Sequence, residues 1–131
     1  MPRTKISETE GLTARAVMHA QFSALPATAT VGDVRAWFAQ SAGRRVAFLA
    51  DGERYAGSLT RAHVAGDGDP RRPAAEVADD GPTVSPDAAA SSGRDLALLT
   101  DSRRVAVVDD GGRLLGVVAV TSDLQSFCGT G

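Results

Sequence analysis

The sequence predicts an α+β protein built from two tandem copies of one β-α-β-β-α unit. Six residues recur at a constant offset of 59 positions, and three more recur at an offset of 60. The first set is Arg44, Arg45, Val46, Ala47, Gly52 and Gly57, matched by Arg103, Arg104, Val105, Ala106, Gly111 and Gly116; the second is Val17, Pro26 and Ala29, matched by Val77, Pro86 and Ala89. Because a half of roughly 60 residues would bury only about 60% of its unfolded surface, we expect the copies to pack together.

The first copy is expected to span residues 12–65, after a polar and aperiodic lead-in, residues 1–11, that we interpret as flexible. Apolar residues at helical spacing predict a short helix within Leu12–His19. A brief extended segment follows at Phe22–Leu25 and stops at Pro26, because the residue before a proline disfavours helix.

The next helix is the best-specified one in the chain. Thr30 can act as its N-cap and Asp33 follows three residues later, which predicts a capped helix from Thr30 to about Ala42. Two strands rich in apolar residues come next, Arg45–Leu49 and Tyr55–Leu59, and Thr60 and His63 stand where the second strand gives way to another helix.

A polar linker, residues 66–73, is expected to separate the copies, and the second copy is expected to span 74–128 with a tail at 129–131. Its predicted elements repeat those of the first copy. The list is an opening helix at Ala74–Ala78, a brief strand at Thr83–Ser85, a helix at Ala88–Leu99, and a hairpin of Arg104–Val108 with Leu114–Val120. Thr121, Ser122 and Asp123 all favour helix N-caps, so the sequence predicts a terminal helix that starts with these side chains clustered together.

Composition excludes several classes of function. The net charge of −2 comes from well-mixed charges, which gives no basic stripe for nucleic acid and no polybasic patch for a membrane. No apolar run approaches the roughly 20 residues of a membrane span, and the N-terminus lacks the apolar core of a signal peptide, so a cytoplasmic protein is expected. The chain shows no catalytic triad, phosphate-binding glycine loop or dinucleotide fingerprint, which argues against an independent enzyme.

The order and spacing of these motifs resemble a tandem pair of CBS domains, the Bateman module. The residues that carry the resemblance are Val17, Met18, Pro26, Gly52, Gly57, Leu59 and Thr60 in the first copy, and Val77, Pro86, Gly111, Gly116, Val117, Val118 and Asp123 in the second. The resemblance implies a regulatory or ligand-sensing unit with no required cofactor, whose repeats pack through their sheets as a pseudo-two-fold pair. It also implies two clefts that take an adenosine-containing ligand such as AMP, ADP, ATP or S-adenosylmethionine.

The implied nucleotide-binding residues lie mostly in the second copy. A carboxylate can accept both ribose hydroxyls, and a helix N-terminus with a hydroxyl can bind phosphate. The candidates are Thr83 and Val105 through nearby main chain, Thr121, Ser122 and Asp123 in the second copy, and Thr60 and His63 in the first. The first copy departs from the family pattern because His63 stands where the ribose-binding Asp is expected. The second copy departs from it because Asp123 lies seven residues after Gly116 instead of six.

Other interpretations of the same residues remain open. Asp123 can serve as a helix cap, His63 as a solvated or capping residue rather than a metal ligand, and Cys128 as an inert thiol. The four arginines that enter equivalent strands, Arg44, Arg45, Arg103 and Arg104, suit solvated strand ends or a shared anionic ligand. A degenerate module with empty clefts, kept for dimerisation or for docking a protein partner, is the alternative function, and a homodimer is expected in either case.

Overall fold

The computed structural model describes residues 3–66 and 68–128. The chain forms two compact units, which we call the central unit, Ser23–Gly81, and the terminal unit, Met1–Phe22 with Pro82–Gly131. Each unit contains a three-stranded sheet with helices against it, so the predicted α+β class is confirmed. Within the described ranges, no helix is long and apolar enough to cross a membrane.

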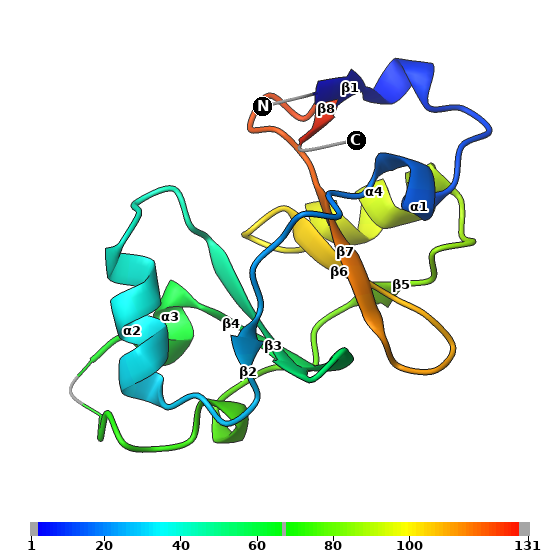
Figure 1. Ribbon diagram of the computed structural model, residues 1–131. Helices are drawn as coiled ribbons and strands as arrows, with labels where there is room; N and C mark the ends of the chain where they lie inside the picture. The colour runs from blue at the N-terminus through cyan, green and yellow to red at the C-terminus, as the bar shows by residue number, and fades with distance from the viewer. Residues whose placement is uncertain (1–2, 67, 129–131) are drawn as a thin grey trace. The chain divides into compact units, whose positions relative to one another are not determined.

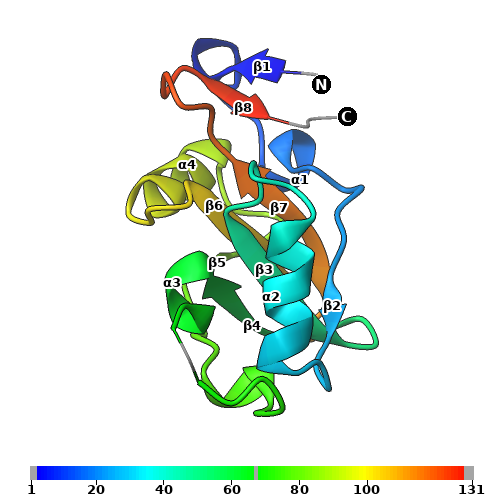
Figure 2. The same ribbon diagram turned by 90° about the vertical axis from the view of Figure 1, so that its left-hand side faces the viewer.

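The central unit is built on a sheet of order β2-β3-β4. Its strands are β2 (Leu25–Pro26), β3 (Val46–Asp51) and β4 (Arg54–Thr60), and its helices are α2 (Val31–Ala39), α3 (Arg61–Val64) and the 3-10 turn η2 (Ala74–Glu76). Figure 2 shows α2 lying across the sheet. The buried core that joins them consists of Val31, Val34, Phe38, Ala47, Leu49, Leu59, Val64 and Ala74.

Helix α2 begins as the sequence predicts. The Asp33 backbone N–H donates to Thr30 Oγ1 at 3.1 Å, and the Thr30 backbone N–H donates to Asp33 Oδ2 at 3.0 Å. This reciprocal capping box satisfies two backbone donors that the first turn of a helix otherwise leaves without partners.

The terminal unit repeats this plan with a sheet of order β5-β6-β7. Its strands are β5 (Thr83–Val84), β6 (Arg104–Val108) and β7 (Leu114–Ala119), and its helices are α1 (Ala14–Val17) and α4 (Ala90–Leu98), of which α4 packs on β6 and β7 (Figure 1). The buried core consists of Ala14, Val17, Val84, Ala90, Ala97, Val105, Val107, Val118, Val120 and Phe127.

The opening segment of each sequence copy lies in the unit formed mainly by the other copy. In the terminal unit, His19 pairs with Val117 on the outer edge of β7, while in the central unit Asp79 pairs with Ser58 on β4 in the same way. Both backbone hydrogen bonds of each pair are present, at 2.7 and 3.0 Å for His19 with Val117 and at 2.8 Å each for Asp79 with Ser58. The units therefore do not coincide with residues 12–65 and 74–128.

The opening segments of the two copies, which we call the crossing segments because each lies in the other copy's unit, explain the repeated glycines Gly57 and Gly116. A Cβ on Gly116 would lie 2.6 Å from Met18 Sδ and 3.0 Å from the carbonyl oxygen of His19. A Cβ on Gly57 would lie 3.2 Å from the Ala78 Cβ, and Gly57 also has a φ of +117°. A side chain at either position would push the crossing segment off the strand.

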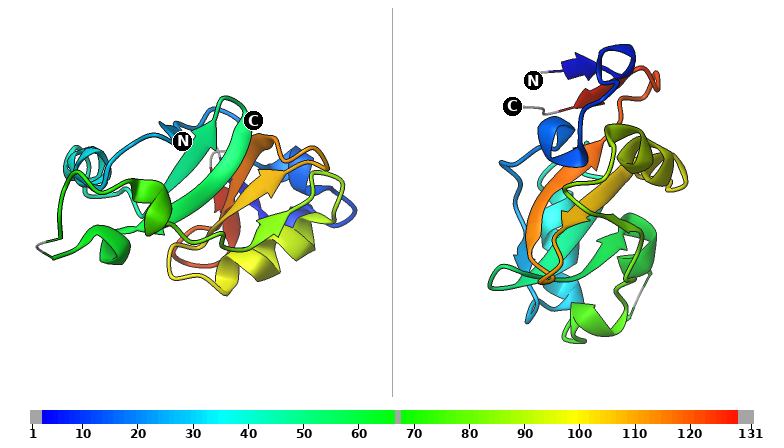
Figure 3. Two further views of the ribbon diagram at one scale, coloured as in Figure 1. Left: turned by 90° about the horizontal axis from the view of Figure 1, so that it is seen from below. Right: turned by 90° about the vertical axis from the view of Figure 1, so that its right-hand side faces the viewer.

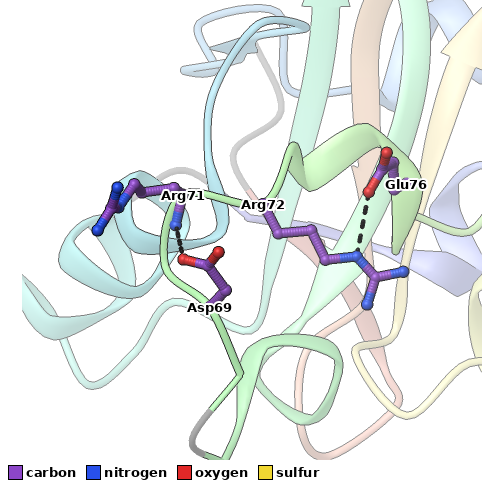
Figure 4. Close-up of polar contacts among 4 residues, drawn as sticks. All are labelled: Asp69, Arg71, Arg72 and Glu76. Atoms are coloured by element: carbon purple, nitrogen blue, oxygen red, sulfur yellow. Dashed lines mark hydrogen bonds and ion pairs between the residues drawn. The ribbon is translucent and has the colours of Figure 1, made fainter.

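Residues 68–73 of the predicted linker are part of the central unit. Arg72 Nε lies 3.1 Å from Glu76 Oε2 in an exposed ion pair, and the Arg71 backbone N–H donates to Asp69 Oδ1 at 2.9 Å (Figure 4). The carbonyls of Arg72 and Pro70 also accept the Val31 and Gly32 backbone N–H groups, so the linker meets the first turn of α2.

The constant offset of 59 is wrong by one residue for the first strand of each hairpin. Leu49 lies opposite Gly57 and Val107 lies opposite Gly116, so Leu49 corresponds to Val107. The second hairpin has one more residue in its turn, because Asp51 pairs directly with Arg54 whereas the Asp109 backbone N–H donates to the more distant Arg113 carbonyl. The identities at the strand entries are therefore out of register in space.

The predicted terminal helix is wrong, because strand β8 (Ser126–Cys128) stands in its place. The chain reverses after Thr121 with Leu124 at a φ of +64°, and the Thr121 backbone N–H donates to the Ser126 carbonyl. This hairpin places Phe127 in the core, where it is fully buried. The predicted tail, residues 129–131, lies outside the described residues.

The expected flexible lead-in has regular structure in the described residues. Strand β1 (Arg3–Lys5) pairs antiparallel with β8, and a 3-10 turn η1 (Ile6–Glu8) follows. Figure 3 shows the blue β1 arrow beside the red β8 arrow. The side chain of Ile6 packs on the core of the terminal unit, which anchors the segment.

Candidate functional site

The candidate residues of the second copy lie toward one end of the strands in the terminal unit's sheet. Strands β5 and β6 are parallel and begin at this end, where the antiparallel β7 ends. Thr83 is exposed and opens β5, and Thr121 follows the end of β7. Val105 is 1% exposed and lies on the middle strand β6, so this residue itself has almost no surface open to a ligand.

Thr121 and Asp123 form the centre of a tight turn between β7 and β8. The Thr121 hydroxyl donates to Asp123 Oδ1 at 2.5 Å, and the Gln125 backbone N–H donates to the same oxygen at 3.1 Å. Thr121 Oγ1 in turn accepts the Ser126 backbone N–H at 3.2 Å. The structure thus brings together the predicted hydroxyl and carboxylate, although in a hairpin turn rather than at a helix N-terminus, while Ser122 lies exposed at the turn's tip.

The Asp123 carboxyl is held in its ionised form. The hydrogen bond from Thr121 lowers its pKa below the ordinary value, and the Gln125 N–H and the positive charge of Arg3 act in the same direction. Since a carboxylate can accept about four hydrogen bonds, the two internal ones leave capacity for hydroxyl groups of a ligand.

A surface pocket of about 470 Å³ lies beside this turn in the terminal unit. Its lining combines the turn with the N-terminal segment: Lys5, Ile6, Ser7, Asp123, Gln125 and Ser126. The volume falls within the roughly 300–1,000 Å³ of small-molecule sites, and the lining offers an ammonium group, hydroxyls and a carboxylate. Sequence reasoning missed Lys5 and Ser7, because a three-residue strand carries no periodic signal.

In the central unit, the side chain of His63 occupies the equivalent position at the end of β4. The Thr60 backbone N–H donates to His63 Nδ1 at 2.8 Å, and the Thr60 hydroxyl lies 3.0 Å from the same nitrogen. Because Nδ1 accepts the hydrogen bond from the Thr60 N–H, the neutral form of the His63 ring carries its proton on Nε2. The capping interpretation of His63 is therefore confirmed.

Arg44 and Arg104, two of the arginines that recur at strand entries, bind backbone carbonyls. Arg44 Nη1 donates to the Trp37 carbonyl at 2.6 Å, and its guanidinium lies 4.4 Å from the Trp37 ring centre. Arg104 Nη1 donates to the Ser102 carbonyl at 2.8 Å. Both guanidinium groups therefore have local structural partners.

Arg61, which is not among the repeated arginines, binds carbonyl groups at the C-terminal end of α2. Arg61 donates to the carbonyls of Phe38 and Ser41 at 3.0 and 2.8 Å, which places its positive charge at the C-terminal end of α2.

No cluster of three or more His, Cys, Asp or Glu side chains suited to a metal ion occurs among residues 3–66 and 68–128. Cys128, partly exposed on β8, lies opposite Arg3 on β1.

Comparison by sequence matches the chain to no family model and to no curated protein. Comparison by structure gives many matches, and the chain resembles a CBS-domain pair/ACT-domain protein of Thermotoga maritima at a TM-score of 0.70 and 17% identity, over 82% of this chain and 89% of that one. It also resembles CBSX2 of Arabidopsis thaliana in complex with AMP, at a TM-score of 0.69 and 15% identity over 83% and 90% of the two chains.

Longer proteins with the same fold are matched over part of their length. The cytosolic domain of the Mg²⁺ channel MgtE in complex with ATP matches at a TM-score of 0.64 and 25% identity, over 79% of this chain and 44% of that one. This chain likewise spans 61% of the CBS-pair domain of a putative Mg²⁺ transporter from Shewanella oneidensis. Several of the matched structures are described as CBS-domain pairs. The chain therefore has the fold of a tandem CBS pair, the Bateman module.

Proposed function

We propose that the chain is a regulatory CBS-pair module that binds an adenosine-containing ligand at Asp123 and passes the bound state to a partner protein. The observation that carries the proposal is the exposed, ionised carboxylate of Asp123, placed beside the Thr121 hydroxyl after the end of β7. A carboxylate in this state accepts both hydroxyls of a ribose. The AMP and ATP complexes of other CBS pairs support this choice of ligand class.

Each candidate residue has a distinct role in this proposal. Asp123 accepts the ribose hydroxyls, Thr121 and Ser122 contact the ligand from the turn, and the main chain near Thr83 and Val105 borders the base. Thr60 and His63 contribute less, because the ring nitrogen of His63 already holds the Thr60 N–H. In this proposal the regulated step is carried out by a partner protein.

The test is a thermal-shift titration of the full chain with AMP, ADP, ATP, S-adenosylmethionine and NAD. A ligand at 100 times its dissociation constant stabilises the folded protein by about 2.7 kcal/mol, which raises the melting temperature by several degrees. We expect the shift to vanish in Asp123→Ala and to persist in Asp110→Ala, a matched exposed carboxylate in the β6–β7 turn. A cooperative melt that no ligand moves contradicts the proposal.

The second candidate function is a docking or dimerisation module with empty clefts. It is favoured by the bond between Thr121 and Asp123, which engages the two candidate ligand groups with each other. We propose a homodimer under either function, located in the cytoplasm. Light scattering during gel filtration, with and without the nucleotides above, measures this directly, and a monomer across micromolar concentrations would contradict it.

A further inference from the structure

The turn that holds Asp123 is connected by hydrogen bonds to the N-terminal segment, residues 3–8, which we call the strap. Asp123 Oδ1 accepts the backbone N–H of Gln125, and the Gln125 carbonyl accepts the backbone N–H of Ile6 at 2.8 Å. Ile6 is the first residue after β1. One residue, Gln125, thus links the position of the carboxylate to the docking of the strap.

Among the described residues, a three-residue strand pairing and a partly buried Ile6 side chain help to hold the strap in place. Strand β1 pairs with β8 over three residues, and Arg3 and Lys5 are exposed. Its apolar anchor is Ile6, which is only partly buried against the core that contains Phe127. Segments with little buried apolar surface open locally at low free-energy cost, so the strap can detach without unfolding the unit.

The strap supplies one wall of the pocket beside Asp123, and the turn supplies the other. Lys5 and Ser7 lie on the strap wall, while Asp123 and Ser126 lie on the turn wall. The carboxylate suits vicinal hydroxyls and the ammonium group suits a phosphate. A ribonucleoside phosphate carries both groups, so one molecule can bridge the two walls.

We propose that the strap is operated by the ligand: a ribonucleoside phosphate bound through its ribose to Asp123 and through its phosphate to Lys5 holds the strap on β8, and the empty pocket releases it. The inference rests on the proposed function and adds to it a phosphate-binding residue and a moving element. A ligand that binds both walls binds the docked state more tightly, and therefore shifts the population toward it.

A cysteine pair can report strap docking in the full chain. Arg3 lies directly opposite Cys128 in the antiparallel β1–β8 pair, where Cα atoms are about 4.5–5.5 Å apart, within the range of a disulfide. In Arg3→Cys, the rate of disulfide formation under mild oxidation therefore measures the docked fraction. Thr4→Cys is the matched control, because Thr4 lies opposite Phe127 and its side chain is on the other face of the strand pair.

The proposal predicts three results for the Arg3→Cys chain. Saturating AMP speeds disulfide formation several-fold, whereas adenosine, which lacks phosphate, has a smaller effect. Lys5→Gln weakens AMP binding about tenfold, as expected for the loss of one charged contact, and leaves adenosine binding unchanged. Arg54→Gln, which removes an exposed cation from β4 of the central unit, changes the affinity for neither AMP nor adenosine.

The outcomes separate this inference from the proposed function. AMP binding that depends on Asp123 but is unaffected by Lys5→Gln, with an unchanged disulfide rate, overturns the strap and leaves the sensor standing. If wild-type protein binds no nucleotide, the proposed ligand fails, and the strap is judged by Asp123→Ala in the ligand-free Arg3→Cys chain. Slower disulfide formation there supports the link through Gln125, and an unchanged rate overturns it.

Discussion

In the central unit, strand β4 runs directly into the short helix α3, whereas in the terminal unit β7 turns back through residues 121–126 into strand β8. The two sheets have the same strand order and the same hairpin bulge, one residue before Gly57 and Gly116. The difference lies in the polar groups at the strand exit. His63 caps its own helix in one unit, while Asp123 organises an exposed turn in the other, so a duplicated scaffold has one closed and one open strand exit.

The largest expected effect tests how strongly the terminal unit depends on its unusual closure. Phe127 is fully buried and belongs to β8, so Phe127→Ala leaves a cavity and weakens the pairing of β1 with β8. We expect a loss of about 3–5 kcal/mol in the free energy of unfolding, measured by urea denaturation. A loss below about 1 kcal/mol would show that the hairpin contributes little to this core.

The next effect compares the two glycines under the crossing segments. Gly116→Ala places a Cβ at 2.6 Å from the flexible side chain of Met18 but also at 3.0 Å from the His19 carbonyl, and we expect a loss of about 1–3 kcal/mol. Gly57→Ala adds backbone strain at a φ of +117° to contacts at 3.2 and 3.3 Å, so a similar loss is expected there. Because Met18→Ala removes the side chain that the new Cβ would contact, it should partly restore the stability lost in Gly116→Ala and leave the loss in Gly57→Ala unchanged. Double-mutant cycles measure both effects.

A smaller effect concerns the helices α2 and α4, which begin differently. Thr30 caps α2, whereas α4 has Ala89 at its N-cap with no side-chain hydrogen bond. Thr30→Ala should cost about 1 kcal/mol, and Ala89→Ser should stabilise the protein by up to a similar amount. Equal melting temperatures for wild type and Ala89→Ser would contradict this account of the difference.

The smallest effect is a pH dependence restricted to the terminal unit. Because hydrogen bonding lowers the pKa of Asp123 in the folded state, its contribution to stability is present above the unfolded pKa and is lost as the pH falls through the folded pKa. Wild-type protein and Asp123→Asn should therefore differ in unfolding free energy near neutral pH and converge in acid. A difference that grows in acid would reverse the sign and contradict the assignment.

The sequence predicted elements whose signals are local and missed those whose signals are not. The cap of α2 by Thr30 and Asp33 and the two hairpins follow from neighbouring residues, and the structure confirms them. Strands β1 and β8 are three residues each, and their pairing joins opposite ends of the chain, which no local pattern reveals. The extra residue in the second hairpin turn was also missed. Sequence identities alone do not show which residues of the two strands face each other, so the predicted offset of 59 was wrong by one residue for the first strand of each hairpin.

The candidate site was predicted in part. The proximity of Thr121 and Asp123 follows from their two-residue spacing, but the sequence assigned it to a helix start because all three residues 121–123 favour caps. The binding roles of Thr83, Val105, Thr121, Ser122, Asp123, Thr60 and His63 stay predictions. The strap wall, with Lys5 and Ser7, could not be found before the β1–β8 pairing was known.

The exchange of opening segments has a consequence for the order in which the molecule is assembled during synthesis. The central unit, Ser23–Gly81, is continuous, so all of its residues are synthesised before the second part of the terminal unit, Pro82–Gly131. Met1–Phe22 must wait for Pro82–Gly131 before it acquires its partners. Early folding of the central unit shortens the effective loop between those two pieces and so lowers the entropy cost of joining them. A release of the nascent chain before β8 would leave β1 without the strand that it pairs with, and capture of β1 by the β8 strand of another molecule becomes the competing reaction.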